Sequence, residues 1–239
     1  MKILITGATS GIGKQLALDY AAEGHDIIAV GRNPDALSEL AANGIRTISV
    51  DLTDRQAVLA SLSGQSGLHL AILNAGTCEY LDMPVFDSAA FSRVLRANVE
   101  SMAHCIEAVL PALRQTEGAR LVGVASAAAF VPLPRAEAYG ASKAAIRYLL
   151  DTLDITLAPF GVAVTSVFPG FVKTPLTDKN DFPMPMQVSV QAASVAIRRG
   201  IEKGQRHIHF PKPFTWPLKV LGLLPQHCWR LLAKRISKS

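Results

Sequence analysis

Residues 2–13 read Lys-Ile-Leu-Ile-Thr-Gly-Ala-Thr-Ser-Gly-Ile-Gly, an apolar run that leads directly into a glycine-rich turn. Glycine permits a tight turn and a close approach of the backbone to a phosphate, and a helix that starts in such a turn points its first N–H groups at the same anion. The spacing is G-x-x-x-G-x-G, whereas the general dinucleotide fingerprint is G-x-G-x-x-G. A purely structural turn is the alternative, but the position between an apolar strand and a helix favours cofactor binding. This interpretation assigns Gly7, Ser10, Gly11, Ile12 and Gly13 to the cofactor.

The rest of the chain alternates short apolar runs with longer amphipathic stretches. Strands are predicted at 2–6, 26–30, 46–50, 68–73, 120–125, 162–168 and 207–210, and helices near 12–23, 34–42, 54–62, 88–114, 139–158 and 189–203. This pattern predicts an α/β protein with a doubly wound (Rossmann), mostly parallel seven-stranded sheet flanked by helices. No shift in composition divides residues 1–205. We expect one domain over residues 1–210 and a basic, amphipathic extension over residues 211–239.

Composition narrows the class of protein. The chain has 239 residues, of which 49% are hydrophobic, and this is enough for one sizeable core. Cys78, Cys105 and Cys228 are odd in number and widely spaced, so they match neither a disulfide framework nor a metal site. No signal-like segment precedes the first strand, and no apolar run is long enough to span a bilayer. We expect a cytoplasmic protein that holds no metal ion.

The net charge of +5 is unevenly distributed along the chain. Residues 1–202 contain 16 Lys and Arg against 19 Asp and Glu, whereas residues 203–239 contain 8 basic residues and no acidic one. The positive charge therefore belongs to the end of the chain and not to the domain, which argues against a nucleic-acid partner.

The carboxyl ends of the predicted strands carry polar residues, and ligands bind at these ends in open α/β sheets. The second strand leads into Gly31-Arg32-Asn33, where no acidic residue is present to bind the ribose 2′-hydroxyl of NAD(H). Arg32 can pair with a 2′-phosphate instead, so NADP(H) is favoured over NAD(H), with a solvated arginine as the alternative. Ser10 and Lys14 are further candidates for phosphate contacts.

Two more polar segments follow the third and fourth strands, namely Asp51-Leu52 and Asn74-Ala75-Gly76. Asp51 would accept a hydrogen bond from the adenine amino group, or it would cap the helix that starts near Asp54. The segment 74–76 would line the cofactor, or it would simply form a turn.

Tyr139 and Lys143 are four residues apart in the stretch Tyr-Gly-Ala-Ser-Lys. On a helix they share one face, and a nearby ammonium lowers the pKa of a phenol from its usual value of about 10. Tyr139 would then act as a general acid or base near neutral pH. Taken alone, such a pair is more often an amphipathic surface feature, so its interpretation depends on the other motifs.

The motifs occur in a characteristic order: Thr6–Gly13, Asp51, Asn74-Ala75-Gly76, Asn98, Ser126, Tyr139-x-x-x-Lys143 and Pro169-Gly170. In this order and spacing, the sequence resembles the short-chain dehydrogenase/reductase family, of the compact single-domain type, over residues 2 to about 210. The resemblance implies an NADP(H)-dependent oxidoreductase that interconverts a carbonyl and an alcohol.

The resemblance also implies a role for each catalytic candidate. Tyr139 would give its proton to the carbonyl oxygen or take it from the alcohol, and Lys143 would lower the Tyr139 pKa and bind the nicotinamide ribose. Ser126 would hydrogen-bond the same substrate oxygen. Asn98 would hold a water that relays protons to Lys143. The plainer alternatives are a strand-end hydroxyl for Ser126 and a buried polar residue for Asn98.

The segment after the sixth strand would hold the nicotinamide through Pro169, Val172 and Thr174, and residues 171–188 would then close over the substrate as an apolar lid. Residues 130–134 would form a second apolar wall. We expect a small lipophilic carbonyl or alcohol as substrate, with packing of these residues on one another as the alternative. By analogy with the family, helices near 90–114 and 139–158 would join subunits into a homodimer or homotetramer.

Residues 211–239 depart from the family pattern. They contain six basic residues, and Trp229, Leu232 and Ile236 fall on one helical stripe. A basic amphipathic helix with tryptophan suits peripheral contact on the inner face of a membrane, and packing on the domain or on a partner subunit is the alternative. A non-catalytic NADP(H) sensor or scaffold that docks through this segment is the second functional hypothesis. A broken catalytic set would favour it, and none of the four positions is broken.

Overall fold

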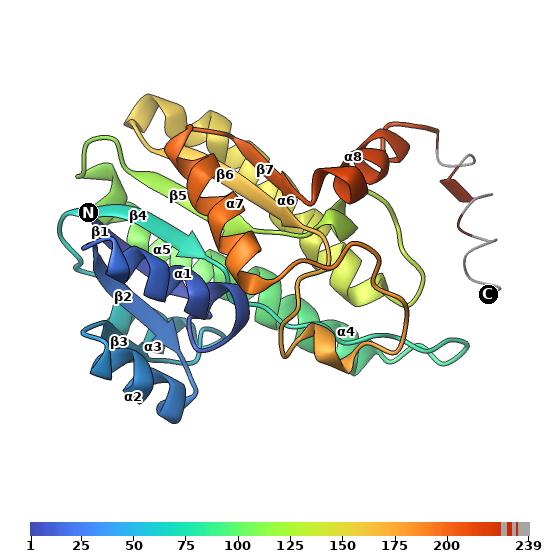
Figure 1. Cartoon of the computed structure of the whole chain (residues 1–239), viewed down its shortest axis with the longest axis horizontal. Coiled ribbons are helices and arrows are strands. Elements are labelled where there is room, and N and C mark those ends of the chain that lie inside the picture. The colour runs from blue at the N-terminus through green and yellow to red at the C-terminus, as the bar shows by residue number, and fades with distance from the viewer. Residues whose placement is uncertain (226–228, 231–232, 234–239) are drawn as a thin grey trace.

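The computed structural model describes residues 1–225, 229, 230 and 233. Its centre is a seven-stranded sheet in the order β3-β2-β1-β4-β5-β6-β7, with each neighbouring pair parallel (Figure 1). The predicted fold class is confirmed. The strands are β1 (Lys2–Thr6), β2 (Asp26–Gly31), β3 (Arg46–Ser49), β4 (Leu68–Leu73), β5 (Arg120–Val124), β6 (Ala163–Pro169) and β7 (His207–Phe210).

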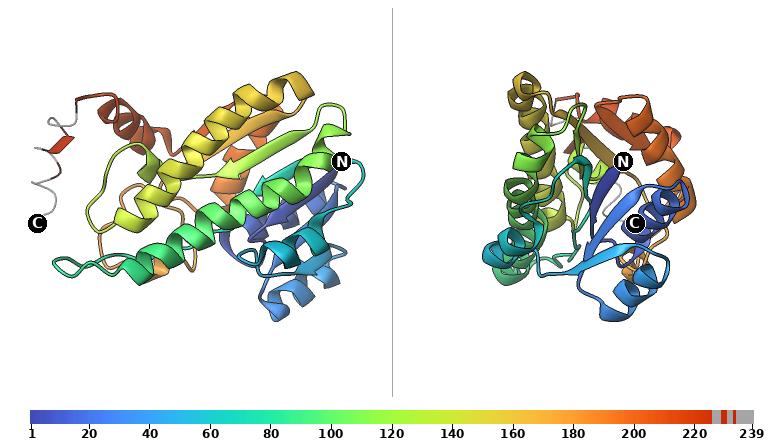
Figure 2. Two further views of the ribbon diagram at one scale, coloured as in Figure 1. Left: turned by 180° about the vertical axis from the view of Figure 1, so that it is seen from behind. Right: turned by 90° about the vertical axis from the view of Figure 1, so that its left-hand side faces the viewer.

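Helices cover both faces of the sheet (Figure 2). One face carries α1 (Gly11–Ala22), α2 (Pro34–Ala42) and α7 (Val190–Glu202). The other carries α3 (Arg55–Leu62), α4 (Ser88–Leu95), α5 (Ser101–Arg114) and α6 (Glu137–Leu157). Short 3₁₀ turns lie at η2 (Ala127–Ala129), η3 (Ala158–Phe160) and η4 (Thr177–Lys179).

β1 shows why the strand sequences are apolar at successive positions. Ile3, Leu4 and Ile5 are all completely buried. Leu4 packs into the cluster beneath α3, α5 and α6, whereas Ile3 and Ile5 pack beneath α1 and α7. A parallel sheet with both faces covered buries consecutive residues and brings the carboxyl ends of its strands to one edge. The loops at that edge form the candidate site.

The long helix predicted at 88–114 is interrupted in the middle. α4 ends at Leu95, residues Arg96–Glu100 form a π-helical turn (η1), and α5 begins at Ser101. A π turn holds an extra residue and occurs frequently at functional sites. Asn98 lies in this turn and is completely buried.

One helix was not predicted from the sequence, namely α8 (Lys212–Leu221), which follows β7. Its prolines argue against a helix, but Pro213 lies in the first turn, where its missing N–H needs no partner, and Pro217 removes only one helical hydrogen bond. α8 packs on the core through Phe214 and Leu218. Within the described ranges, the helices are all too short or too polar to cross a bilayer.

The predicted stripe of Trp229, Leu232 and Ile236 lies outside the described residues except for Trp229. The Trp229 side chain is buried, and its Nε1 donates a hydrogen bond to the carbonyl oxygen of Pro132 at 2.7 Å. Trp229 itself therefore contacts the domain.

Candidate active site

The turn between β1 and α1 is shaped by glycine. Gly7 has a φ of +64°, and a Cβ on it would lie 2.8 Å from the Cα of Ala75. A Cβ on Gly13 would lie 2.3 Å from the carbonyl oxygen of Gly7 and 2.6 Å from Nδ2 of Asn74. The backbone of the turn therefore packs directly on the start of α1 and on the loop after β4. Ser10, the N-cap of α1, does not cap the helix with its hydroxyl, so the first N–H groups can face an anion.

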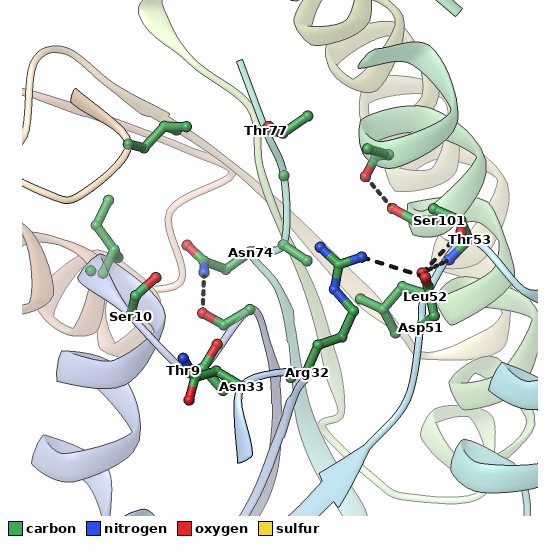
Figure 3. Close-up of a pocket in the computed structure, with 18 of the residues that line it drawn as sticks. Thr9, Ser10, Arg32, Asn33, Asp51, Leu52, Thr53, Asn74, Thr77 and Ser101 are labelled. Atoms are coloured by element: carbon green, nitrogen blue, oxygen red, sulfur yellow. Dashed lines mark hydrogen bonds and ion pairs between the residues drawn. The ribbon is translucent and has the colours of Figure 1, made fainter. Parts of the chain in front are cut away.

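A cavity of about 410 Å³ opens beside this turn (Figure 3). The predicted residues that line it are Gly7, Ser10, Gly11, Ile12, Arg32, Asp51, Leu52, Asn74, Ala75, Gly76 and Thr174. Lining residues that the sequence did not single out are Thr9, Gly31, Asn33, Val50, Thr53, Thr77, Ala97, Ser101 and Leu176. The other predicted cofactor residues lie outside the lining, namely Gly13, Tyr139, Lys143, Pro169 and Val172.

Arg32 and Asp51 face each other at one side of the cavity (Figure 3). Nη1 of Arg32 lies 3.4 Å from Oδ2 of Asp51, and the arginine side chain is 73% exposed. Hydrogen bonds from the backbone and hydroxyl of Thr53 hold the pKa of Asp51 below its usual value, and Arg32 adds to the effect. The helix cap is Asp54, whose carboxylate accepts from the N–H of Ala57. The capping alternative for Asp51 is therefore wrong.

Asn74 ties the end of β4 to the glycine turn. Its Nδ2 donates to the carbonyl oxygens of Thr6 and Gly7 at 3.2 and 3.3 Å, and its backbone N–H donates to the Thr6 hydroxyl at 3.1 Å. Asn74 therefore fixes the shape of the cavity that it lines.

Tyr139 and Lys143 lie one turn apart on α6, and burial dominates the pKa of both. Nζ of Lys143 is 5.7 Å from the centre of the Tyr139 ring and donates to the carbonyl oxygen of Val124 at 3.0 Å. The predicted lowering of the tyrosine pKa is wrong: burial raises the pKa of Tyr139 to about 12, although the neighbouring Ser126 hydroxyl opposes the shift. Burial also lowers the pKa of Lys143 to about 8. Desolvation is the largest cause of both shifts, because it disfavours the charged form of each group.

Ser126 follows β5 and lies beside Tyr139, where its hydroxyl acts to lower the pKa of the phenol. Cys78, which the sequence did not single out as a site residue, is half-buried at the same place. Burial raises the pKa of its thiol, and the Lys143 ammonium partly offsets this shift. Ser126, Tyr139 and Lys143 thus meet at one point, which Cys78 borders.

Asn98 has its side-chain amide fully engaged in hydrogen bonds. Oδ1 accepts from the N–H of Thr77 at 2.7 Å, and Nδ2 donates to the carbonyl oxygen of Thr77 and to Oγ of Ser142, both at 2.9 Å. The Ser142 hydroxyl donates to the carbonyl oxygen of Tyr139 at 2.7 Å. Asn98 therefore joins the loop after β4 to the turn of α6 that carries Tyr139. Its role as the holder of a relay water stays a prediction.

The segment after β6 reaches the cavity through Thr174 and Leu176. Thr174 lines it, and a Cβ on Gly11 would lie 3.0 Å from Cγ2 of Thr174. Val172 is buried and pairs with Val188 in a parallel bridge that closes the base of the lid, residues 171–188. Thr174 thus faces the cavity, whereas Val172 packs beneath it.

The lid is attached to its surroundings by an arginine that the sequence did not single out. Arg135 donates to Asp181 of the lid at 2.7 Å and to Asp82 at 2.9 Å. Its guanidinium lies 5.4 Å from the centre of the Tyr80 ring, and the Tyr80 hydroxyl donates to Oδ1 of Asn180 at 2.9 Å. Arg135 therefore connects the lid with the loop after β4.

The predicted apolar wall, residues 130–134, does not line the cofactor cavity. The Phe130 ring packs 4.8 Å from that of Phe168, between ring centres, in the core. The wall lines a second cavity of about 1080 Å³, which it shares with α6, with Leu221 and with Trp229. It therefore faces the end of the chain.

Comparison with known proteins settles the family to which this arrangement belongs. Residues 1–183 match the family model described as short chain dehydrogenase. The chain belongs to the short-chain dehydrogenase family. The resemblance inferred from the motifs is confirmed, and with it the expectation of a nicotinamide-dependent oxidoreductase that acts on alcohol and carbonyl groups.

Curated relatives of this short-chain dehydrogenase are named as enzymes. An uncharacterized oxidoreductase of Myxococcus xanthus is 32% identical over 98% of this chain and 96% of its own. An NADPH-dependent 1-acyldihydroxyacetone phosphate reductase of Schizosaccharomyces pombe is 34% identical over 74% of this chain and 62% of its own. The 11-beta-hydroxysteroid dehydrogenase-like 3 protein of Arabidopsis thaliana is 29% identical over 94% and 77%. These names favour an enzyme over the non-catalytic sensor.

Similar solved structures contain nicotinamide dinucleotides, but they do not decide between NAD(H) and NADP(H) for this chain. A short-chain dehydrogenase of Sphingobium yanoikuyae in complex with NADPH has a TM-score of 0.80 and 26% identity, covering 99% of this chain and 94% of that one. One of Burkholderia phymatum in complex with NAD has a TM-score of 0.81 and 23% identity, covering 91% of each, and this likeness shows the fold. A nicotinamide dinucleotide is therefore the cofactor of this short-chain dehydrogenase, and the choice between the two forms depends on its own residues.

Proposed function

We propose that this short-chain dehydrogenase is an NADP(H)-dependent oxidoreductase that interconverts a carbonyl and an alcohol on a lipophilic substrate, with Tyr139 as general acid and base. The meeting of Ser126, Tyr139 and Lys143 beside the cofactor cavity carries the proposal. A Cβ on Gly76, which lines that cavity, would lie 3.4 Å from Nζ of Lys143. The proton-transferring group and the dinucleotide would therefore be neighbours.

The residues of the cavity fit a dinucleotide. The glycine turn and the first N–H groups of α1 would hold the diphosphate, because no side chain blocks the approach of the backbone. Arg32 would hold the 2′-phosphate, and Thr174 would lie at the nicotinamide side. The bound cofactor supplies a hydride to the substrate carbon, or accepts one from it.

The protein's own groups handle the proton. With a pKa of about 12, Tyr139 is a phenol at neutral pH, which is the form that donates a proton to a carbonyl oxygen. Ser126 would donate a hydrogen bond to the same oxygen and stabilise its developing negative charge. Lys143, with a pKa of about 8, is mostly an ammonium at pH 7 and would return a proton to the tyrosinate. At neutral pH, Tyr139 is therefore in the protonation state that carbonyl reduction requires.

Substitution of Tyr139 by phenylalanine tests the mechanism. Tyr139→Phe should lower kcat about 10²- to 10⁴-fold on a panel of carbonyl substrates followed by nicotinamide absorbance, because the proton donor is lost. NADPH binding, measured by fluorescence titration, should change less than about twofold, since the tyrosine lies outside the cavity lining. Tyr148→Phe, an exposed tyrosine on the same helix, is the matched control. A Tyr139→Phe enzyme of normal activity would refute the proposal.

The preference for NADP(H) is supported by Arg32. It lines the cavity at the end of β2, and its only ion pair among the described residues is the 3.4 Å contact with Asp51. Lys14, the other cationic candidate, pairs with Glu39 at 2.6 Å and lies outside the lining. Arg32 is therefore the group that a 2′-phosphate would meet.

Substitution of Arg32 tests this preference. Arg32→Ala should weaken NADPH binding about 10- to 100-fold, the value of a charge-assisted hydrogen bond to phosphate, and should leave NADH binding nearly unchanged. Arg46→Ala, an exposed arginine on β3 that does not line the cavity, is the control. Equal losses for the two cofactors would contradict the assignment.

The lipophilic character of the substrate is supported by the lid. Phe182 packs edge-on against Tyr80 and against Phe171, so aromatic rings surround the entrance side of the site. Two relatives carry names that refer to an acyl compound and to a hydroxysteroid. Such a substrate partitions into bilayers, so membrane contact by residues 211–239 belongs to the same proposal.

A series of methyl ketones of increasing chain length tests whether the substrate pocket is apolar. The kcat/KM should rise by about fourfold per added methylene until the pocket is filled, and a flat series would exclude an apolar pocket.

A homodimer through α5 and α6 is supported by exposed apolar side chains on α6. Tyr148 and Ile155 are two turns apart on one face, and both are largely exposed. Light scattering should give twice the chain mass, and Ile155→Glu should give the single-chain mass. A monomeric wild-type protein would exclude this assembly.

A further inference from the structure

Several large exposed apolar side chains belong to segments at the end of the molecule where the active site opens. Val85 and Phe86 lie in the loop after β4, Met186 lies in the lid, and Trp216, Val220 and Leu223 lie on α8 and the turn that follows it. These segments follow the carboxyl ends of β4, β6 and β7, and Figure 1 shows α8 and the loop after β4 at the same end of the molecule. Contiguous exposed apolar residues mark an interaction surface, whereas single ones do not, and α8 holds such residues at successive turns.

α8 is anchored by one face and presents the other to solvent. Phe214 and Leu218 pack on the core, and the Phe214 ring lies 5.3 Å from that of Phe171 at the base of the lid, between ring centres. On the outer side, Trp216 and Val220 are one turn apart and each is about half exposed, at 50% and 49%. Leu223 continues this outer face in the next turn and is 81% exposed. The docking stripe, defined as Trp216, Val220 and Leu223, is therefore the outer face of a segment whose inner face contacts the base of the lid through Phe214.

The charge around the docking stripe is positive. Lys219 lies 5.8 Å from the centre of the Trp216 ring, and within the described part of the chain neither Lys219 nor Lys212 forms an ion pair. Residues 203–239 contain 8 Lys and Arg and no Asp or Glu. The acidic residues of the loop after β4 are paired, since Asp82 contacts Arg135 and Asp87 lies near Arg93. The charged residues of α8 itself are therefore two lysines, Lys212 and Lys219, which are unpaired within the described ranges.

We propose that the docking stripe, with Lys212 and Lys219 at its sides, binds the surface of a bilayer that contains anionic phospholipid. Tryptophan and aliphatic side chains insert at the interface, and lysines reach the phosphates from its edge. A second copy of the chain fits less well, because two stripes in contact would bring their lysines together with no acidic residue in 203–239 to offset them. The surface deepens the proposed function, since it would place the lid at the membrane from which a lipophilic substrate enters.

Vesicle co-sedimentation of the full chain tests the surface without any measurement of turnover. Vesicles of phosphatidylcholine with phosphatidylglycerol should bind the protein, and vesicles of phosphatidylcholine alone should bind at least about tenfold less of it. Each lysine contributes about fivefold to binding at an anionic surface, so added salt should weaken the binding. The double variant Lys212→Gln/Lys219→Gln should lose about tenfold or more. Trp216→Ser should lose a similar factor, whereas Phe160→Ser, an equally exposed aromatic residue at the other end of α6, should not.

The fluorescence of Trp216 in the wild-type protein gives a second test of membrane contact, which does not depend on whether the Trp216→Ser or lysine variants fold. The wild-type emission should shift to shorter wavelength on anionic vesicles, and Trp216→Phe should bind them while losing most of the shift, since Trp229 is already buried. Equal sedimentation of wild type and the Trp216→Ser and lysine variants would overturn the proposal. A Trp216-dependent dimer in solution without vesicle binding would also overturn it in favour of a second copy. If the protein failed to oxidise NADPH, the proposed enzymatic function would be refuted, but the vesicle-binding results would not change. The membrane surface and the enzymatic function are therefore tested independently.

Discussion

The two halves of the active-site edge are held together by different kinds of contact. At the cofactor half, glycine backbone packs on backbone, as at Gly7 and Gly13, and Asn74 joins the turn to β4 through main-chain carbonyl oxygens. At the substrate half, the lid is joined by the exposed ion pairs of Arg135 and by the Tyr80 hydroxyl. Close-packed backbone segments fit together in a single arrangement and cannot shift without clashes. Exposed ion pairs contribute little stability, and salt screens them, so they can separate. The cofactor half is therefore preformed, and the substrate half can open.

The largest effect is expected from a substitution at Gly13, which should disrupt the preformed cofactor half. In Gly13→Ala, the new Cβ would lie 2.3 Å from the carbonyl oxygen of Gly7, so the turn must move. We expect NADPH binding to fall at least about 100-fold and the free energy of unfolding to fall by about 1–3 kcal/mol, the usual cost of overpacking. Fluorescence titration and urea unfolding measure the two effects.

Gly140→Ala on α6 is the matched control, because a Cβ there would meet nothing closer than 3.9 Å. It should leave NADPH binding intact and stabilise the helix slightly. If Gly13→Ala were as harmless as Gly140→Ala, the cofactor half would not be built on backbone packing.

Lys143, which stands where the two halves meet, should give a distinctive pH dependence of stability. Its pKa in the folded protein, about 8, lies below the usual 10.5, so between these pH values the unfolded chain binds more protons than the folded chain. The contribution of Lys143 to the free energy of unfolding should therefore rise with pH across this window, by up to about 3 kcal/mol. Urea unfolding of wild type and Lys143→Met from pH 6 to about 10.5 would show stability curves that diverge.

Lys212→Met provides the baseline for this measurement, because Lys212 is exposed and its curve should run parallel to that of the wild type. Parallel curves for Lys143→Met as well would mean that the ammonium is not desolvated at the site.

The smallest effect is expected at the lid. Arg135→Leu removes the contacts to Asp82 and Asp181, so backbone amides of residues 176–187 should exchange with solvent about fivefold faster at low salt, a change of about 1 kcal/mol in the opening free energy. High salt should bring the wild type closer to the variant. Hydrogen exchange followed by mass spectrometry measures both.

Arg93→Leu separates the lid from its neighbour, because Arg93 pairs with Glu79 in the loop after β4 and makes no ion pair with the lid among the described residues. Exchange in 176–187 should stay at the wild-type rate. Equal acceleration by both substitutions would show that the loop, and not Arg135, restrains the lid.

The sequence predicted the cofactor half better than the substrate half for a physical reason. The strand, the turn and the helix of residues 2–13 are contiguous, so propensity and spacing suffice to place them. Arg135 meets Asp82 and Asp181 across separations of 53 and 46 residues, and no spacing rule connects them. The Tyr139 pKa was predicted in the wrong direction because the approach of Lys143 is visible in the sequence, whereas the burial that outweighs it is not. α8 is not predictable from its composition because proline disfavours helices in general, and only the position of Pro213 in the first turn makes it compatible with this one.

The π turn at Arg96–Glu100 has less regular helical hydrogen bonding than an α-helix, but it places Asn98 where the site needs it. A regular α-helix over residues 88–114 would have better-aligned backbone hydrogen bonds, but one residue fewer in this turn would rotate the preceding segment by about 100°. Asn98 would then leave Thr77 and Ser142, and the loop after β4 would lose its connection to α6. The helix therefore gives up some regular backbone hydrogen bonding in exchange for the Asn98 contacts that hold the loop after β4 against α6.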